Sequence, residues 1–275
     1  MSRAFPVLAT TLAALSVCVV FIVPFVFIVF TAVKSGEQAM QLDFSWPASW
    51  HAWDNLTEVL RTRNWMVVRA FVNSAIITVA SVALLVVVSA LVGFVLQRRK
   101  TRWNGLINFL VLVGLMLPPA VVPTIFLLQG LGLFASIHGI ILIEVAYNLP
   151  FCILLYRAFI ATIPRELDEA AIIDGAGPLD VFFRVLLPLL WPVTVTIIVV
   201  KTVAVFNDFV NPLYYLPGTG NVTVQLTLYN FQSQFSTAYH LLFMNILIIT
   251  IPPLIVFLIF NRQIVAGMTA GSIKG

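Results

Sequence analysis

The chain has 275 residues, of which 61% are hydrophobic and only 9% are charged, and its mean hydropathy is +1.04. Since soluble domains carry about a quarter charged residues, this chain cannot cover its surface with polar groups in water. These values exclude a soluble globular enzyme, a secreted disulfide-rich protein and a disordered chain. The net charge of +4 does not indicate nucleic-acid binding, because no basic patch is interleaved with aromatic residues. The apolar runs have the length of membrane helices.

Six apolar runs are long enough to cross a bilayer, for which a helix needs about 20 residues. The first run is longer than the apolar region of a signal peptide, about 7–15 residues, so we interpret it as a retained helix. We therefore predict an all-α integral membrane protein, with residues 1–275 in a single transmembrane domain and its core at 67–262. The predicted spans are residues 8–33, 67–96, 106–134, 140–160, 189–213 and 239–260.

The positive charges gather on one side of this six-span arrangement. The turn after the second span contains four bases and no acid: Arg98, Arg99, Lys100 and Arg102. Arg3, Arg262 and Lys274 fall on the same side. Basic loops mark the cytoplasmic face, so we predict that both termini are cytoplasmic.

Two segments are then predicted to be external, 34–66 and 212–238. The first contains four Trp residues and a helix-like stretch at 54–60, which favours a helix lying at the membrane interface. The second contains the turn signal Pro217-Gly218-Thr219-Gly220-Asn221.

The internal segment 161–188 differs from the rest of the chain in its charge. Thr162 is expected to cap a first helix that has Pro164 in its first turn and ends at Gly175. A second helix is expected from Pro178, with Asp180 and Arg184 opposite one apolar face. That face is predicted to consist of Leu179, Phe182, Phe183, Leu186 and Leu187.

Acidic residues outnumber basic ones in this segment, the reverse of what an anionic inner leaflet would attract. The acids are Glu166, Asp168, Glu169, Asp174 and Asp180, against Arg165 and Arg184. This balance indicates a surface that docks a protein with basic groups. A solvated turn between two spans is the alternative.

The run Glu169-Ala170-Ala171, followed by Gly175 and by Val185-Leu186-Leu187-Pro188, resembles the EAA motif of ABC-importer permeases. The spacing matches throughout, and Val185 in place of Ile is the one departure. Other parts of the chain are similar to the maltose-type carbohydrate importers. These are Asn73-Ser74, the run from Phe206 to Phe209 with Pro212, and the tail 261–271.

The resemblance implies the type I permease fold of an ABC importer in the bacterial inner membrane, with segment 161–188 forming a coupling helix. It implies four kinds of partner: a homologous permease in a heterodimer, two ATP-binding subunits, an external solute-binding protein and a sugar. Segment 212–238 would reach toward the binding protein, and the tail after Arg262 toward the ATPases. The residues that would contact the ATPase are Glu169, Ala170, Ala171, Asp174, Gly175 and Pro188.

The chain lacks the residue patterns of a catalytic or metal site. No GxxxxGK[ST] run is present to hold a nucleotide, so ATP-Mg would be used by the partner ATPases and not by this chain. Cys18 and Cys152 lie within predicted spans without metal-ligand spacing, and the three His residues are isolated. We therefore predict no enzyme activity, no cofactor and no metal site.

Charged residues within spans normally face a cavity or a partner, because burying them in lipid costs several kcal/mol. Lys201 and Asp208, seven residues apart, are expected on nearly the same face of the fifth span. Direct pairing of Glu144 with Lys201, to fix the packing of helices, is the alternative. The residues predicted to line a translocation path are Glu144, Asn148, Lys201, Asn207, Asp208 and Asn211.

Proline residues in the spans predict kinks or breaks at 24, 118–119, 123, 150 and 252–253. The function predicted from the whole sequence is the permease subunit of an ABC importer for a sugar or oligosaccharide. A permease for another solute, such as a glycerol phosphate or a peptide, is one alternative. An ion-coupled secondary transporter and a membrane scaffold or receptor are two others.

Overall fold

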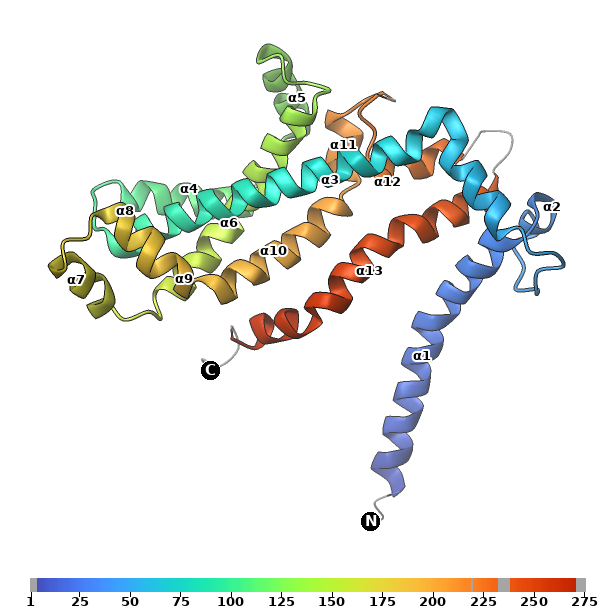
Figure 1. Ribbon diagram of the computed structural model, residues 1–275, viewed down its shortest axis with the longest axis horizontal. Helices are drawn as coiled ribbons and strands as arrows, with labels where there is room; N and C mark the ends of the chain where they lie inside the picture. Colours follow the sequence, from blue (N-terminus) through green and yellow to red (C-terminus); the bar gives the residue numbers. More distant parts are fainter. Residues whose placement is uncertain (1–3, 219, 232–237, 271–275) are drawn as a thin grey trace. The chain divides into compact units, whose positions relative to one another are not determined.

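The computed structural model describes residues 4–218, 220–231 and 238–270, and within these ranges the regular structure is entirely helical (Figure 1). The side chains of residues 261–270 lie outside the description, as do residues 271–275, so the predicted role of the tail after Arg262 is not addressed by the structure. The helices are α1 Ala4–Val33, α2 Gly36–Ala39, α3 Ala52–Arg98, α4 Asn104–Met116, α5 Val121–Gly130, α6 Ile137–Ile160, α7 Glu166–Ile173, α8 Pro178–Asp180, the π-helix η1 Val181–Leu186, α9 Leu187–Leu189, α10 Trp191–Phe206, α11 Val210–Tyr215, α12 Val224–Thr227, the 3-10 helix η2 Leu228–Phe231 and α13 Tyr239–Ala270.

Four helices in the described ranges are long and apolar enough to cross a membrane: Leu15–Val33, Ala52–Arg98, Ile137–Ile160 and Tyr239–Phe260. Counting each of two bent helix pairs as one span raises the total to six: Asn104–Met116 with Val121–Gly130, and Pro178–Leu189 with Trp191–Phe206, which meet at 72°. These four helices contain the first, second, fourth and sixth predicted spans, apart from the first few residues of the first.

The third predicted span, 106–134, is broken into α4 and α5, which meet at an angle of 117°. Pro118 and Pro119 lie in the break. Neither can donate a backbone hydrogen bond, and each disfavours helical geometry in the residue before it. By contrast, α1, α6 and α13 continue through their internal prolines.

The fifth predicted span, 189–213, is also interrupted. Helix α10 ends at Phe206, and α11 begins at Val210 after three residues outside either helix. Asp208 stabilises this restart, because its Oδ1 accepts hydrogen bonds from the backbone N–H groups of Val210 at 2.9 Å and Asn211 at 3.3 Å. Lys201 and Asp208 therefore do not share one helix, and the prediction that they lie on one helical face was wrong.

The described residues divide into two compact units, Met1–Ala70 with Val224–Ile251, and Phe71–Thr223 with Pro252–Gly275. In the first unit the side chain of Lys34 is buried, and its Nζ lies 2.8 Å from Oδ1 of Asp43. This hydrogen bond holds the pKa of Asp43 below its usual range. Buried Asn55 donates from Nδ2 to the carbonyls of Ala32 and Lys34, at 2.8 and 2.9 Å.

The segment 34–66 carries the predicted helix in its second half, as the first part of α3. That part ends at a run of left-handed residues, Arg63, Asn64 and Trp65, after which α3 continues toward Arg98. The four Trp side chains, at positions 46, 50, 53 and 65, are all exposed. Their placement at a membrane interface stays a prediction.

The second unit has a core shared by α3, α6, η1 and α10. Leu85 and Phe94 of α3, Tyr156 of α6, Leu186 of η1 and Ile197 of α10 are among its buried members. Helices α3 and α6 approach closely at Gly93, where a Cβ would lie 3.0 Å from Cβ of Tyr156, so a larger residue would push them apart. In Figure 1, α7 (olive) and α8 lie at one end of the helices of this unit, near the C-terminal end of α3. The prediction of one domain for the whole chain stays a prediction.

Candidate functional site

The acidic helix of the 161–188 segment is α7, which packs on η1. None of its eight residues, all of which the structure describes, is buried. It begins at Glu166 without a side-chain cap. Thr162 instead donates from Oγ1 to the carbonyl of Phe159, at the end of α6, so the prediction that Thr162 caps this helix was wrong. Pro164 lies before the helix and not in its first turn.

Helix α7 ends as its sequence predicts, at a glycine in the left-handed region. Gly175 has a φ of +88°. The N–H of Gly175 donates to the carbonyl of Ile172 at 3.0 Å, and that of Ala176 donates to the carbonyl of Ala171 at 2.9 Å. These two bonds form a Schellman motif, which satisfies the last carbonyls of the helix and turns the chain sharply.

The second part of the segment begins at Pro178 as predicted, but it continues as the π-helix η1. A π-helix has i→i+5 hydrogen bonds, so its side-chain period is longer than that of an α-helix. Val181, Phe182 and Leu186 are consequently buried, while Leu179 and Phe183 are exposed. The prediction of a single apolar face containing both Leu179 and Phe183 was wrong for this reason.

The remaining side chains of the segment form an exposed surface of mixed character. Glu169, Ala170, Asp174, Gly175 and Pro188 are exposed, whereas Ala171 is half-buried against the core.

Exposed apolar side chains lie beside the acids: Leu167, Ile172, and Ile173 with 85% of its surface accessible. We call the exposed part of α7 with Asp174 and Gly175 the α7 surface. Apolar groups exposed next to charges are typical of a protein interface. Asp180 and Arg184 form an exposed ion pair of 3.3 Å.

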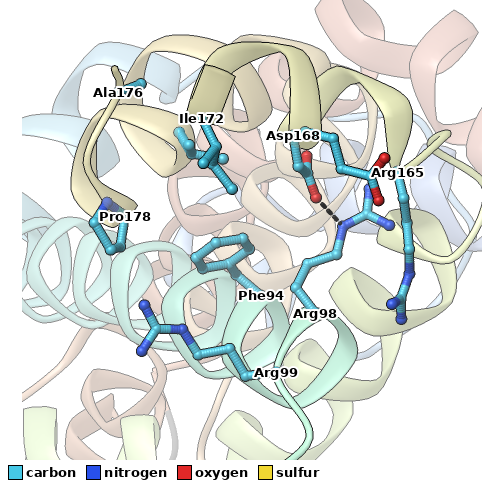
Figure 2. A pocket seen from close by; sticks show the side chains of 10 residues that line it. Phe94, Arg98, Arg99, Arg165, Asp168, Ile172, Ala176 and Pro178 are labelled. Carbon is cyan, nitrogen blue, oxygen red and sulfur yellow. Dashed lines mark ion pairs between the residues drawn. The ribbon is translucent and has the colours of Figure 1, made fainter. Parts of the chain in front are cut away.

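One ion pair joins α7 to the end of α3. Nε of Arg98 lies 2.7 Å from Oδ2 of Asp168, and the two side chains are only 7% and 13% exposed. Figure 2 shows this pair beside a pocket of about 350 Å³, into which Ile172 points toward Phe94. Burial raises the pKa of Asp168, and the charges of Arg98 and Arg165 oppose that rise.

The polar residues predicted within the fourth and fifth spans form a connected network. Glu144 in α6 is only 2% exposed, and its Oε1 accepts a hydrogen bond of 3.0 Å from Nδ2 of Asn211 in α11. Asn148 donates to the backbone carbonyl of Glu144 at 2.8 Å and accepts from Nζ of Lys201 at 2.9 Å. The carboxyl group of Asp208 interacts with that of Glu144.

Glu144 and Lys201 are therefore joined through Asn148, and within the described ranges they form no direct ion pair. Lys201 Nζ also lies 4.5 Å from the centroid of the Phe151 ring. Asn207 lies between α10 and α11 and is exposed. Five of the predicted path residues are thus brought together: Glu144, Asn148, Lys201, Asp208 and Asn211.

The sequence did not single out two features of these sites. Arg98 was assigned only to the basic turn, since nothing in a run of four bases indicates which one meets an acid 70 positions further on. The hydroxyl groups of Tyr147 and Tyr215 lie 2.9 Å apart and connect α6 to α11. Among the described residues, no three His, Cys, Asp or Glu side chains gather as a metal site requires.

Comparison with known proteins shows which family has this arrangement. Residues 86–270 match the family described as "Binding-protein-dependent transport system inner membrane component". Two relatives from Bacillus subtilis (strain 168) are each 32% identical. The "Probable ABC transporter permease protein YurM" matches over 92% of this chain and 83% of the relative. The "Melibiose/raffinose/stachyose import permease protein MelC" matches over 97% and 96%.

A solved structure has the same fold. It is a chain from a bacterial ABC transporter involved in the import of the acidic polysaccharide alginate, with a TM-score of 0.83 and 19% identity over 95% of this chain and 98% of that chain. The alginate transporter in complex with its pentasaccharide-bound periplasmic protein gives a TM-score of 0.70. The family match covers well over half of the chain. The chain therefore belongs to the binding-protein-dependent transport inner membrane components, and it is a multi-pass, non-catalytic permease subunit of an ABC importer in the inner membrane.

Proposed function

We propose that this permease subunit carries a sugar or oligosaccharide across the inner membrane after a solute-binding protein delivers it. The observation that carries the proposal is the full-length similarity to MelC, which is named for melibiose, raffinose and stachyose import. The "Multiple sugar-binding transport system permease protein MsmG" of Streptococcus mutans is also similar, at 29% identity over 93% of both chains.

The α7 surface is proposed to dock on an ATP-binding subunit, with the segment 161–188 on the cytoplasmic side. Glu169 offers an exposed carboxylate to a basic partner, and Ala170 and Ala171 keep the helix narrow enough to enter a groove. Gly175 provides the sharp exit, next to Asp174. Pro188 lies further along, in α9.

The proposed architecture has six spans, with each bent helix pair at the third and fifth positions serving as one, and both termini in the cytoplasm. A homologous permease completes the pathway, and two ATP-binding subunits use ATP-Mg. Nucleotide binding would close the ATPases and shift the permeases between inward-open and outward-open states. It can do so only by binding one state more tightly than the other.

The network of Glu144, Asn148, Lys201, Asp208 and Asn211 is proposed to line the translocation path, together with the exposed Asn207. Amides, carboxylates and an aromatic ring beside Lys201 can together hydrogen-bond and pack against a polyol. Buried polar groups inside a membrane protein also face the bundle interior in general. Uptake that is unchanged in Asn207→Leu and Asp208→Leu, at normal expression, would remove this assignment.

The docking proposal is tested by purifying the complex through a tag on this chain. We expect Glu169→Lys to lose the co-purifying ATPase, because the substitution places a positive charge against basic groups. Glu58→Lys is the matched control, since it makes the same change of charge on an exposed residue outside the α7 surface and should retain the ATPase. Retention of the ATPase by Glu169→Lys would contradict the docking proposal.

The substrate proposal is tested on the solute-binding protein that co-purifies with the wild-type complex. Its thermal stability should rise with an oligosaccharide of the melibiose or raffinose type, since a ligand that binds only the folded state raises stability. The same sugar should enter proteoliposomes that contain the complete transporter and ATP. If only peptides or glycerol phosphate stabilise the binding protein, the proposal of a sugar substrate is wrong.

A further inference from the structure

We propose that Arg98 is a positioning residue that couples α7 to α3, so that movement of the ATPases reaches the transmembrane helices through the Arg98–Asp168 ion pair. This inference rests on the proposed docking of α7 to an ATP-binding subunit.

The first observation is that one guanidinium group holds two parts of the segment. Nε of Arg98 pairs with Oδ2 of Asp168 in α7, at 2.7 Å. Its Nη2 donates to the backbone carbonyl of Ile163, before α7, at 2.9 Å. Arg98 is also the last residue of α3, so its backbone belongs to a long helix of the unit. The side chain therefore fixes both the entry to α7 and the helix itself to α3.

A second arginine makes the reciprocal connection. Nη2 of Arg165, the residue before α7, donates to the backbone carbonyl of Gln97 at 3.3 Å. Carbonyl groups in the last turn of a helix have no partner within it and readily accept such bonds. The two arginines thus cross-connect the end of α3 with the start of α7.

The third observation is that apolar packing between α7 and α3 is weak. The pocket of about 350 Å³ lies between them, lined by Phe94 of α3 and by Ile172 of α7. Ile172 is 60% exposed, and no residue of α7 is buried. Helix α7 also packs on η1, whose Phe182 meets Phe94 of α3. Its direct polar contacts with α3 are the ion pair and the Arg165–Gln97 hydrogen bond, and of these the ion pair joins two side chains whose displacement would pull on α3.

Burial makes the loss of either member of this pair costly. The exposed pair Asp180–Arg184 is surrounded by water and weakly attractive, whereas charges shielded from solvent interact strongly. Removing one member of a shielded pair leaves the other without compensation, which is strongly unfavourable. The end of α3 and the start of α7 are therefore expected to move together.

The experiment uses the complete transporter in proteoliposomes, with its binding protein and sugar, and measures sugar imported per ATP hydrolysed. In Arg98→Ala and Asp168→Ala, ATPase subunits should still co-purify and hydrolyse ATP, but sugar imported per ATP should fall by about tenfold, within the usual range of coupling between sites. The exchanged pair, Arg98→Asp with Asp168→Arg, should recover most of that loss. Arg98→Lys should recover part of it, because Lys keeps the charge but not the forked geometry.

Arg102→Ala is the matched control for the loss of a positive charge in the same turn. Its guanidinium is exposed, lies 5.1 Å from the ring centroid of Trp103 and makes no ion pair with the described residues. It should import as much sugar per ATP as the wild type. Equal losses in Arg102→Ala and Arg98→Ala, or an unchanged ratio in Arg98→Ala, would overturn the inference.

A second measurement covers the case in which the single variants do not assemble. Cysteines at positions 98 and 168, in a background of Cys18→Ser and Cys152→Ser, are joined in the assembled complex by a short cross-linker that a reductant cleaves. Sugar imported per ATP should be high with the link intact and fall on cleavage, and an equal ratio in both states would overturn the inference. If wild-type complexes contain no ATPase or import no sugar, the proposed function fails instead.

Discussion

Gly175 is the residue at which the chain leaves α7. Residues with a Cβ adopt its backbone conformation only at a cost in free energy. Its φ of +88° lies in the left-handed region, while no atom lies within 4 Å of the position where a Cβ would be built. A side chain here would meet open space, so the cost is confined to the backbone and amounts to about 1–3 kcal/mol. The local need for glycine therefore arises from the Schellman turn and not from packing.

We predict that Gly175→Ala lowers the thermal midpoint of the purified complex and the initial rate of uptake, because α7 must shift to relieve the strain. Gly177→Ala is the control, two residues further on. Its φ is −73°, and an added Cβ would lie at an ordinary contact distance of 3.5 Å from Oδ2 of Asp180. Thermal unfolding in detergent and radiolabelled uptake measure the two effects. Comparable losses in both variants would show that the left-handed backbone is not the reason.

At the scale of elements, η1 shows how the longer period of a π-helix decides which of two neighbouring side chains is buried. Phe182 is 2% exposed and lies with its ring centroid 5.3 Å from that of Phe94 in α3, whereas Phe183 is 52% exposed. The same π-helix places Leu186 in the core with α6 and α10. The part of the segment that follows α7 therefore packs into the core of the second unit, while α7 itself remains on the surface.

We predict that Phe182→Ala destabilises the protein by about 3–5 kcal/mol, the usual cost of removing a buried aromatic ring and leaving a cavity. Phe183→Ala removes the same ring from an exposed position and should change stability far less. Denaturant or thermal unfolding of the detergent-solubilised protein, followed by circular dichroism, compares the two. An equal loss in both variants would contradict the packing of η1 described here.

The same elements show what the sequence could and could not predict. The run from Ile140 to Ile160 is mostly apolar and predicted α6 nearly to its ends, and Gly175 predicted the end of α7 correctly, because both signals are local. The π-helix was missed because the apolar spacing from Leu179 to Leu187 also fits an α-helix, and the packing of Phe182 and Leu186 in the core is not a local signal. Asp208 was placed on the wrong element because the break after Phe206 carries no proline or glycine. The partner of Arg98 was missed because it lies 70 positions away.

At the scale of the whole molecule, an ion pair joins the basic turn to the acidic segment, so the two are expected on the same side of the membrane. Arg98 begins the run of four bases predicted to be cytoplasmic, and its contact with Asp168 brings α7 to the same end of its unit. The charge rule and the ion pair are independent observations, since one depends on composition and the other on position. If the basic turn is cytoplasmic as the charge rule predicts, the ion pair places α7 on that side too, and segment 212–238 is then expected on the opposite face.

We predict that a membrane-impermeant maleimide distinguishes these two faces in a protein with Cys18→Ser and Cys152→Ser. Ile173→Cys, at the most exposed apolar position of α7, should react only after the inner membrane is opened, and more slowly when ATPase subunits cover it. Gly220→Cys, at an exposed position with no atom within 4 Å of its Cβ site, should react in intact spheroplasts. The protein without cysteines controls for background labelling, and uptake confirms that each variant is folded. Labelling of Ile173→Cys from outside would reverse the proposed topology, because α7 would then be separated from ATP by the membrane.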